Sequence, residues 1–288
     1  MAAVYRRELK SYFQSMTGYV FIAFMVLFIG IYFMAYNMMS GYPYFSYTLS
    51  GMVTIIMIGI PVLTMRSFAD DRKTKTDQLL LTSPVSVGKI VLGKYLSMVT
   101  VFAVPVILSC LCPLIIKMNG TAHLKADYAA ILAFFLLGCV YIAIGMFISS
   151  LTESQIIAAV GTFGIILLLL LWPNLVGFLP TTALGSLIGF FLLWSLAVLI
   201  VNRITSHTGL AVILEAVGII VMVGLYLIKK GLFDRALTNV MEKVAITGVF
   251  QNFATHYIFD LGGLVTYISI IFLLVFLTVQ SIEKRRWS

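Results

Sequence analysis

Residues 66–90, RSFADDRKTKTDQLLLTSPVSVGKI, form a charged segment between two long apolar runs, and this alternation decides the fold. Of the 288 residues, 61% are hydrophobic and only 10% are charged, whereas soluble domains carry about 25% charged residues. The mean hydropathy is +1.07. This composition excludes a soluble protein and predicts an all-α, polytopic membrane protein.

Eight apolar runs reach about the 20 residues that a membrane-spanning helix needs. They cover about 18–39, 48–66, 91–117, 128–151, 154–173, 181–202, 208–229 and 262–282. An even number of spans places both termini on one side of the membrane. Of the 19 Lys and Arg residues, 13 then lie on that side and the remaining six on the other. The positive-inside rule therefore makes the side of the termini cytoplasmic, and the net charge of +8 indicates a membrane surface rather than nucleic acid.

Two amphipathic segments accompany the spans. In residues 1–17, five apolar side chains recur on one helical face, which predicts a helix lying in the cytoplasmic interface; a plain extension of the first span is the alternative. They are Tyr5, Leu9, Tyr12, Phe13 and Met16. The segment 229–261 predicts a short amphipathic helix at the outer interface, followed by a re-entrant or second short helix around 250–257. An ordinary outer loop is the alternative there.

Residues 88–95, GKIVLGKY, begin like the phosphate-binding pattern G-x-x-x-x-G-K. That pattern requires Ser or Thr after the Lys, because the hydroxyl binds magnesium, but the position holds Tyr95. We interpret the stretch instead as the start of the third span. Lys89 and Lys94 are then expected to extend to the cytoplasmic headgroups.

The segment 66–90 mixes acidic and basic residues and then carries three consecutive leucines, Leu79, Leu80 and Leu81. The residue before Pro84 is disfavoured in a helix, so we expect a short helix that ends near Thr82. Exposed apolar residues usually mark an interface, which indicates docking on another protein. An ordinary solvated loop is the alternative.

The turn SSLTESQ, residues 149–155, joins the fourth and fifth spans. Ser150 and Glu153 have the spacing of a capping box, so we expect them to cap the fifth helix. So short a turn predicts that the two helices are antiparallel neighbours. Thr152 lies between the two capping residues.

Glu215 lies inside the seventh apolar run, where an ionisable group is costly and often functional. Arg203 and His207 are its nearest expected partners in sequence. A proton or cation site is one interpretation; a structural pair, or a carboxyl kept neutral by burial, is the other. We interpret Cys110, Cys112 and Cys139 as small apolar residues and predict no metal site.

Three stretches resemble one family. Residues 71–96, DRKTKTDQLLLTSPVSVGKIVLGKYL, resemble the cytoplasmic signature of ABC-2 type transporter permeases, and most closely the gliding-motility branch. Residues 145–159 and 250–287 are similar to the same branch. The resemblance is weakest over about 174–249, where the chain carries an extra pair of spans beside the family's six-span core. Gln78 and Lys75 depart from the usual Glu and Gly, and Asp71 replaces a usual Glu.

The resemblance implies a type V exporter-like helical bundle, treated as a single transmembrane domain over residues 1–288. It implies that 66–90 is a coupling segment that docks on a separate ATPase subunit, which would hold ATP and Mg²⁺. The residues carried over to this role are Asp70, Asp71, Thr76, Asp77, Gln78, Leu79, Leu80, Leu81 and Pro84, with Ser150, Thr152 and Glu153 at the cytoplasmic turn. It also implies a second permease chain, contact with lipid and, as in gliding-type systems, an accessory extracytoplasmic protein.

The predicted function is therefore the permease of an ATP-driven exporter, in a bacterial inner membrane. An ion-coupled secondary carrier that uses Glu215 is the alternative; many such carriers show internal repeats, and none is detectable here. A membrane enzyme is the weakest hypothesis, because the chain contains neither H-E-x-x-H nor G-x-S-x-G. No residue selects a substrate.

Overall fold

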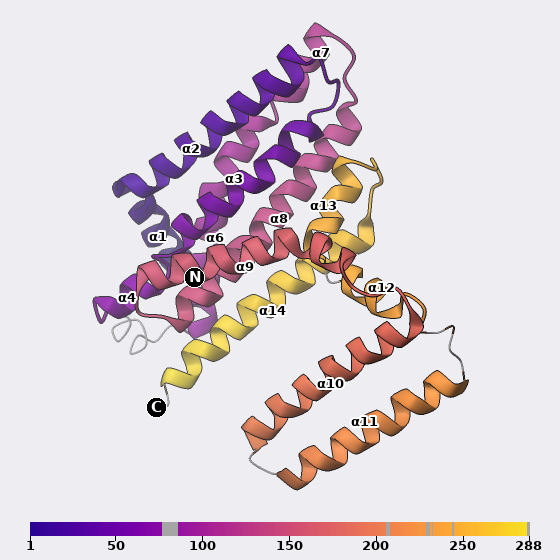
Figure 1. The fold of residues 1–288 in the computed structure, drawn as a ribbon. Coiled ribbons are helices and arrows are strands. Elements are labelled where there is room, and N and C mark those ends of the chain that lie inside the picture. The colour runs from indigo at the N-terminus through magenta and orange to yellow at the C-terminus, as the bar shows by residue number, and fades with distance from the viewer. Residues whose placement is uncertain (77–85, 206–207, 229–230, 232, 244, 287–288) are drawn as a thin grey trace. The chain divides into compact units, whose positions relative to one another are not determined.

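Helices form nearly all of the regular structure in the computed structural model, which describes residues 1–76, 86–205, 208–228, 231, 233–243 and 245–286 (Figure 1). Within these residues there is no strand. The chain forms two compact units. The first contains residues 1–169 and 249–288, and the second contains residues 170–248.

The first unit is a bundle of helices. In chain order they are α1 (Ala2–Gln14), α2 (Met16–Tyr32) continued by the π-helix η1 (Phe33–Met39), α3 (Ser46–Thr64), α4 (Ala69–Lys73), α6 (Val87–Ser109), α7 (Cys112–Asn119), α8 (Leu124–Leu151), the first part of α9 (Gln155–Gly177), most of α13 (Ile246–Ala254) and α14 (Leu261–Arg286).

The long helix α8 lies at the centre of the first unit and packs against α3, α6 and α14. Of its most apolar stretch, 78% is buried, compared with 28% for the corresponding stretch of α2. Two glycines allow this close packing. A side chain at Gly138 would collide with the Phe102 ring, and one at Gly145 would collide with Thr64.

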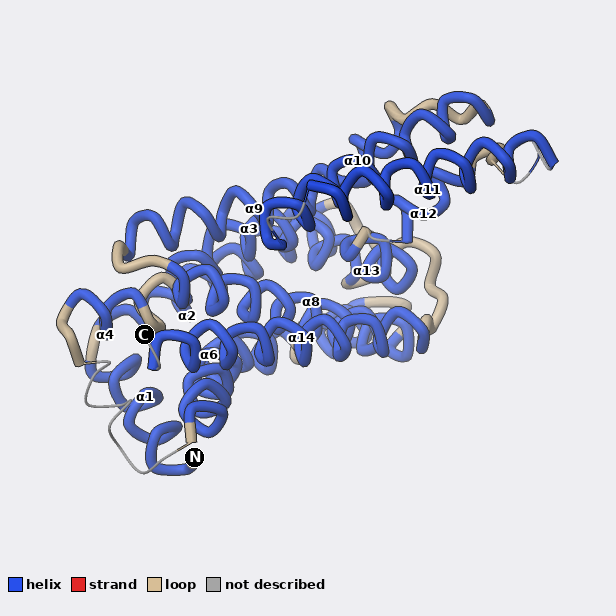
Figure 2. The backbone as a smooth tube through the Cα atoms, turned by 90° about the horizontal axis from the view of Figure 1, so that it is seen from below, coloured by secondary structure: helices blue, strands red, loops and turns tan. Residues whose placement is uncertain are grey.

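Six helical segments are long and apolar enough to cross a membrane among the residues described. They are Met16–Met39, Ser46–Lys73, Val87–Asn119, Leu124–Leu151, Gln155–Gly177 and Leu261–Lys284. They correspond to the first five and the last of the eight predicted spans. The C-terminal end of α14 lies at the same end of the first unit as α1 and α4 (Figures 1 and 2), as predicted for termini on one side of the membrane.

The predicted extra pair is present as two helices of the second unit, α10 (Ala183–Thr205) and α11 (Thr208–Ile228). Their described apolar stretches, residues 183–199 and 213–226, are shorter than those of the six segments above. The Trp194 indole packs against Gly218 and donates a hydrogen bond to the Leu214 carbonyl at 3.2 Å. That the pair spans the membrane stays a prediction.

The segment 229–261 contains two short helices, as predicted for the region between the last spans. The first is α12 (Ala236–Lys243), in the second unit, where Leu237 packs against Gly189 of α10. In the same unit, the Trp172 indole donates to the Met241 carbonyl at 2.9 Å. The second is α13, in which Phe250 and Phe253 are buried.

Candidate functional site

The N-terminal helix α1 packs along α6. Gly93 of α6 lets it approach closely, because a side chain there would contact Val4 and the Tyr5 backbone at 3.1–3.3 Å. The Tyr5 and Thr100 hydroxyls are also hydrogen-bonded at 3.0 Å. The predicted amphipathic helix is therefore confirmed as a helix, although its inner face rests on protein. Met16 does not belong to that face, since it begins α2 and is 82% exposed.

Lys94 of α6 is the centre of a charged cluster. Its ammonium lies 2.8 Å from an Asp71 carboxylate oxygen and 3.1 Å from a Glu8 oxygen, and it donates to the Ser67 carbonyl at 2.8 Å. The side chain is only 3% exposed. All three ammonium hydrogens can thus have an acceptor, which a buried charge requires.

The expectation that Lys94 extends to the headgroups is wrong. The lysine lies about two helical turns inside α6, where α1 and α4 bring carboxylates close enough to offset its loss of hydration. The Phe68 ring, 5.2 Å from the ammonium, adds a cation–π contact. Lys89, five residues closer to the helix start, is exposed.

The short helix α4 is anchored to the C-terminal end of α8. The Ser149 hydroxyl accepts hydrogen bonds from the backbone N–H groups of Phe68 and Ala69, both at 3.1 Å, and donates to the Met65 carbonyl at 3.2 Å. Helix starts leave such N–H groups unpaired, so Ser149 supplies the cap from another helix. The described part of segment 66–90 and residues of the turn 149–155, about 80 residues apart in sequence, are brought together here.

Two side chains of this region complete the attachment. The Gln155 amide donates to the Asp70 carboxylate at 2.5 Å, and the Arg72 guanidinium donates to the Thr152 carbonyl at 3.4 Å. Asp70 and Thr152 had both been predicted as site residues, and the structure places their elements in contact. Helices α8 and α9 also pack against each other near this turn, where Ile148 lies close to Gly161.

The predicted capping box is wrong. Ser150 lies inside α8, fully buried, and its hydroxyl donates to the Phe147 carbonyl at 2.7 Å. Ser154 precedes α9 instead, and its hydroxyl accepts from the Ile157 N–H at 3.5 Å. Because α8 continues to Leu151, Ser150 and Glu153 fall on opposite sides of the helix end.

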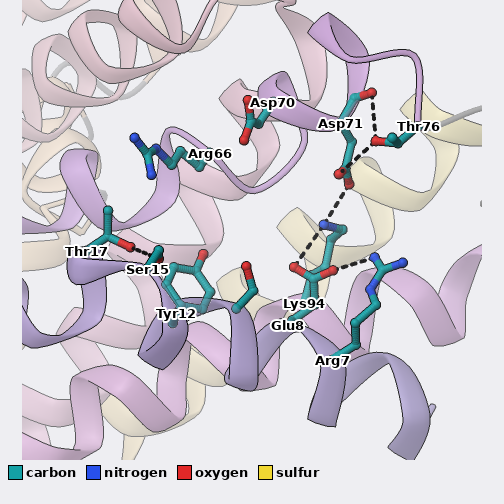
Figure 3. Close-up of a pocket in the computed structure, with 11 residues that line it drawn as sticks. Arg7, Glu8, Tyr12, Ser15, Thr17, Arg66, Asp70, Asp71, Thr76 and Lys94 are labelled. Atoms are coloured by element: carbon teal, nitrogen blue, oxygen red, sulfur yellow. Dashed lines mark hydrogen bonds and ion pairs between the residues drawn. The ribbon is translucent and has the colours of Figure 1, made fainter.

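A polar cleft of about 490 Å³ opens between α1, α4 and α6 (Figure 3). Lys94, Glu8 and Arg7 lie at one end, while Arg66, Ser15 and Thr17 lie at the other. Its remaining lining residues are Ser11, Tyr12, Asp70, Asp71 and Thr76.

Tyr12 and Thr76, which line the cleft, form hydrogen bonds with neighbouring residues. Burial, followed by the nearby Glu8 and Asp71 carboxylates, raises the pKa of the Tyr12 hydroxyl. The hydroxyl therefore stays protonated and donates to the Leu63 carbonyl at 3.3 Å. The Thr76 hydroxyl lies 3.3 Å from an Asp71 carboxylate oxygen.

Several predicted residues are not brought into this cluster. Asp77, Gln78, Leu79, Leu80, Leu81 and Pro84 lie outside the described residues, as does the predicted end of the short helix near Thr82. Glu215 is half-buried in α11, and the Arg203 side chain, its predicted partner, is not among those described. Over the described residues no group of three or more His, Cys, Asp or Glu side chains could hold a metal ion.

Sequence reasoning missed Glu8, Ser149 and the true role of Lys94. One signal was available for Glu8, which is the sole acidic residue of the basic segment 1–17. It lies four residues before Tyr12, on the apolar face of the helix. An acid on such a face indicates a buried partner of opposite charge, which the printed sequence alone does not identify.

Comparison with known proteins identifies the family of this chain. The family described as ABC-2 family transporter protein matches residues 2–204, which contain the Lys94 cluster, α4 and the turn between α8 and α9. A search of curated proteins gave no match. Since the family match covers more than half of the chain, and six helical segments among the described residues are long and apolar enough to cross a membrane, this protein is an integral membrane protein of the ABC-2 transporter family.

Proposed function

We propose that this chain is the permease subunit of an ATP-driven exporter of the gliding-motility branch, with segment 66–90 as the docking site for a separate ATPase subunit. One observation carries the proposal. The start of that segment, α4, is bound by Lys94 to α1 and α6 and by Ser149 to α8. A force applied to α4 would thus act on three further helices directly.

In this mechanism, ATP-driven closure of two ATPase subunits moves α4. Asp71 of α4 and Glu8 of α1 share one buried ammonium, so separating them would leave a charge without a partner. Such separation is strongly unfavourable, and the three elements are therefore expected to move together. Their joint displacement would open a path beside a second permease chain, identical or different.

ATP and Mg²⁺ are assigned to the ATPase subunit. Residues 88–95 of this chain do not fit a phosphate, because they belong to the helix α6 and the Lys94 ammonium is already held by two carboxylates. Both termini are assigned to the cytoplasm of a bacterium. An accessory extracytoplasmic protein is part of the proposal by likeness to gliding-type systems.

The first test is co-purification. A C-terminal tag and mild solubilisation of native membranes should recover a soluble subunit with a complete P-loop, in fixed ratio to this chain. A homo-oligomer without an ATPase in more than one detergent would contradict the proposal and favour a carrier that uses Glu215. Glu215→Gln would then abolish transport, an effect not expected of the exporter.

The docking surface is tested separately with Leu79→Glu and Leu80→Glu. Each places a charge on an expected apolar contact, so the ATPase subunit should no longer co-purify although the permease still inserts. Retention of the ATPase in both variants would show that it docks elsewhere.

Transmission through the cluster is tested with Lys94→Gln in the reconstituted complex. We expect the ATPase subunit to remain bound while the part of ATP hydrolysis that depends on the permease is lost. Lys89→Gln is the matched control, because Lys89 is an exposed lysine five residues away on the same helix. Equal hydrolysis in the two variants would exclude Lys94 as the link.

A further inference from the structure

An apolar groove of about 300 Å³ runs between α2 and α3, next to the polar cleft. Val20 and Phe24 line it on α2, and Ile58 and Val62 line it on α3. Gly59 lies at its floor and lets α2 approach α3 closely, since even a methyl group there would lie 3.1 Å from the Phe21 ring. Both helices belong to segments that can cross a membrane, so the groove faces the environment of acyl chains.

The groove and the cleft meet at Thr17, which lines both. The Thr17 hydroxyl is hydrogen-bonded to that of Ser15 at 2.7 Å, and Figure 3 shows Arg66 beside these two residues. Within a short distance, the surface thus changes from a nearly wholly apolar trough to a cluster of hydroxyls and a guanidinium.

Arg66 differs from the other cations of the cleft. Lys94 is paired with Glu8 and Asp71, and Arg7 is paired with Glu8 at 2.6 Å. Across the described part of the chain no carboxylate forms an ion pair with Arg66, whose side chain is exposed. Its guanidinium is therefore available to bind a phosphate with two parallel hydrogen bonds.

We infer that this site binds an anionic phospholipid of the leaflet next to α4, with one acyl chain in the groove and the phosphate on Arg66 and the Ser15–Thr17 hydroxyls. A soluble phosphate would use only the polar part, and an uncharged lipid only the apolar part. A phospholipid with a net negative headgroup matches both parts and their order along the helices. This inference is independent of the ATPase and of the transported substrate.

The headgroup contact is tested by native mass spectrometry of the purified full-length chain. Wild type should retain more phosphatidylglycerol than phosphatidylcholine with the same acyl chains. Arg66→Gln should reduce that preference roughly fivefold, the effect expected for one cation near an anionic lipid surface. Lys10→Gln removes an exposed cation of α1 that does not line the cleft and should leave the preference unchanged.

The chain contact is tested with Val62→Trp, which fills the groove from a side chain that is 48% exposed. Both lipids should be lost in parallel, with their ratio kept. Ile58→Trp, at 46% exposure, repeats the test if the first variant folds poorly. Leu92→Trp, on the exposed side of α6, is the control for an added surface tryptophan.

Three results would overturn the inference. The first is an Arg66→Gln variant that keeps the wild-type preference for phosphatidylglycerol. The second is groove variants that retain lipid as well as Leu92→Trp does. The third is displacement of phosphatidylglycerol by glycerol 3-phosphate alone, which would make the site one for a soluble phosphate.

Discussion

Different interactions stabilise the two ends of the first unit. At the α1–α4 end, a buried ammonium links three helices through ion pairs with Glu8 and Asp71. At the opposite end, buried polar side chains bind the backbone of a loop. The Asn37 amide donates to the carbonyls of Tyr42 and Tyr44 at 2.8 and 3.0 Å, and Asp127 accepts from the Phe45 N–H at 2.8 Å.

Ring stacking adds to the second end. Tyr44 is stacked between His123 and Tyr257, with ring centroids 4.5 and 4.3 Å away. These three residues come from three different loops. The α1–α4 end therefore joins whole helices through one shared charge, whereas the opposite end fixes loops through many short-range contacts. We interpret the first as suited to transmit a displacement and the second as suited to resist one.

Among the variants that test this difference, Lys94→Met is expected to lose the most stability. It leaves two carboxylates without their shared partner, and removing one member of a buried pair destabilises by about 3 kcal/mol. Thermal unfolding in detergent should show the loss, while Lys89→Met should unfold as wild type does. If the two variants have the same Tm, the cluster is not a structural link.

At the opposite end, Asp127→Ala removes a fully buried acceptor and leaves the Phe45 N–H unpaired. Such a loss costs about 2 kcal/mol, so the Tm should fall, but less than in Lys94→Met. Permease-dependent ATP hydrolysis per folded molecule should not change. A variant that folds well yet loses coupling would remove the distinction between the two ends. Asp127→Asn keeps an acceptor oxygen and should lose less stability.

The aromatic stack is tested with Tyr44→Leu, which keeps an apolar side chain and removes both ring contacts. Stacked pairs contribute about 1 kcal/mol, so a small fall in Tm is expected. Limited proteolysis of residues 40–45 and 255–260 should become faster, because the loops lose a common support. Unchanged cleavage at both loops would show that the buried amide and carboxylate suffice. Tyr19→Leu, at an exposed ring of α2, is the control.

The smallest effect is a pH dependence at Asp260, which precedes α14. The Gly263 N–H bonds one carboxylate oxygen at 2.8 Å and the Asn252 amide bonds the other at 3.0 Å. These bonds lower the pKa of Asp260, because they favour the ionised form. Its stabilising contribution is thus complete above the ordinary pKa and is lost as the pH falls through the lowered value.

Asp260→Asn measures that contribution. The variant should be less stable than wild type at neutral pH by about 0.5 kcal/mol, as for a weak helix cap. Below the ordinary pKa of an aspartate the difference should narrow. A difference that stays constant from pH 7 to pH 3 would show that ionisation of Asp260 does not matter.

The sequence predicted some features of the candidate site and missed others, and individual residues show why. The turn 149–155 and the segment 66–90 were singled out from the sequence by their polar residues between apolar runs and by the family resemblance, and the structure brings their described parts together. Ser149 itself was not singled out, because its role is to cap α4, a helix about 80 residues earlier. The local spacing of Ser150 and Glu153 predicted that they cap the next helix. Spacing alone does not show where α8 ends, because packing extends α8 to Leu151.

Local hydropathy was enough for the sequence by itself to determine the helical class and the existence of all eight predicted helices. For 229–261 it left two short helices and an ordinary loop as alternatives, and the structure decided for the helices. Apolar length is a property of neighbouring residues, and each helix satisfies its own backbone hydrogen bonds. Only the tertiary structure decided that Lys94 is buried, that Glu8 and Asp71 share its charge, and that Arg66 does not pair with them. Those outcomes depend on which helices approach each other, and the energy of a charge depends on every neighbour that folding brings to it.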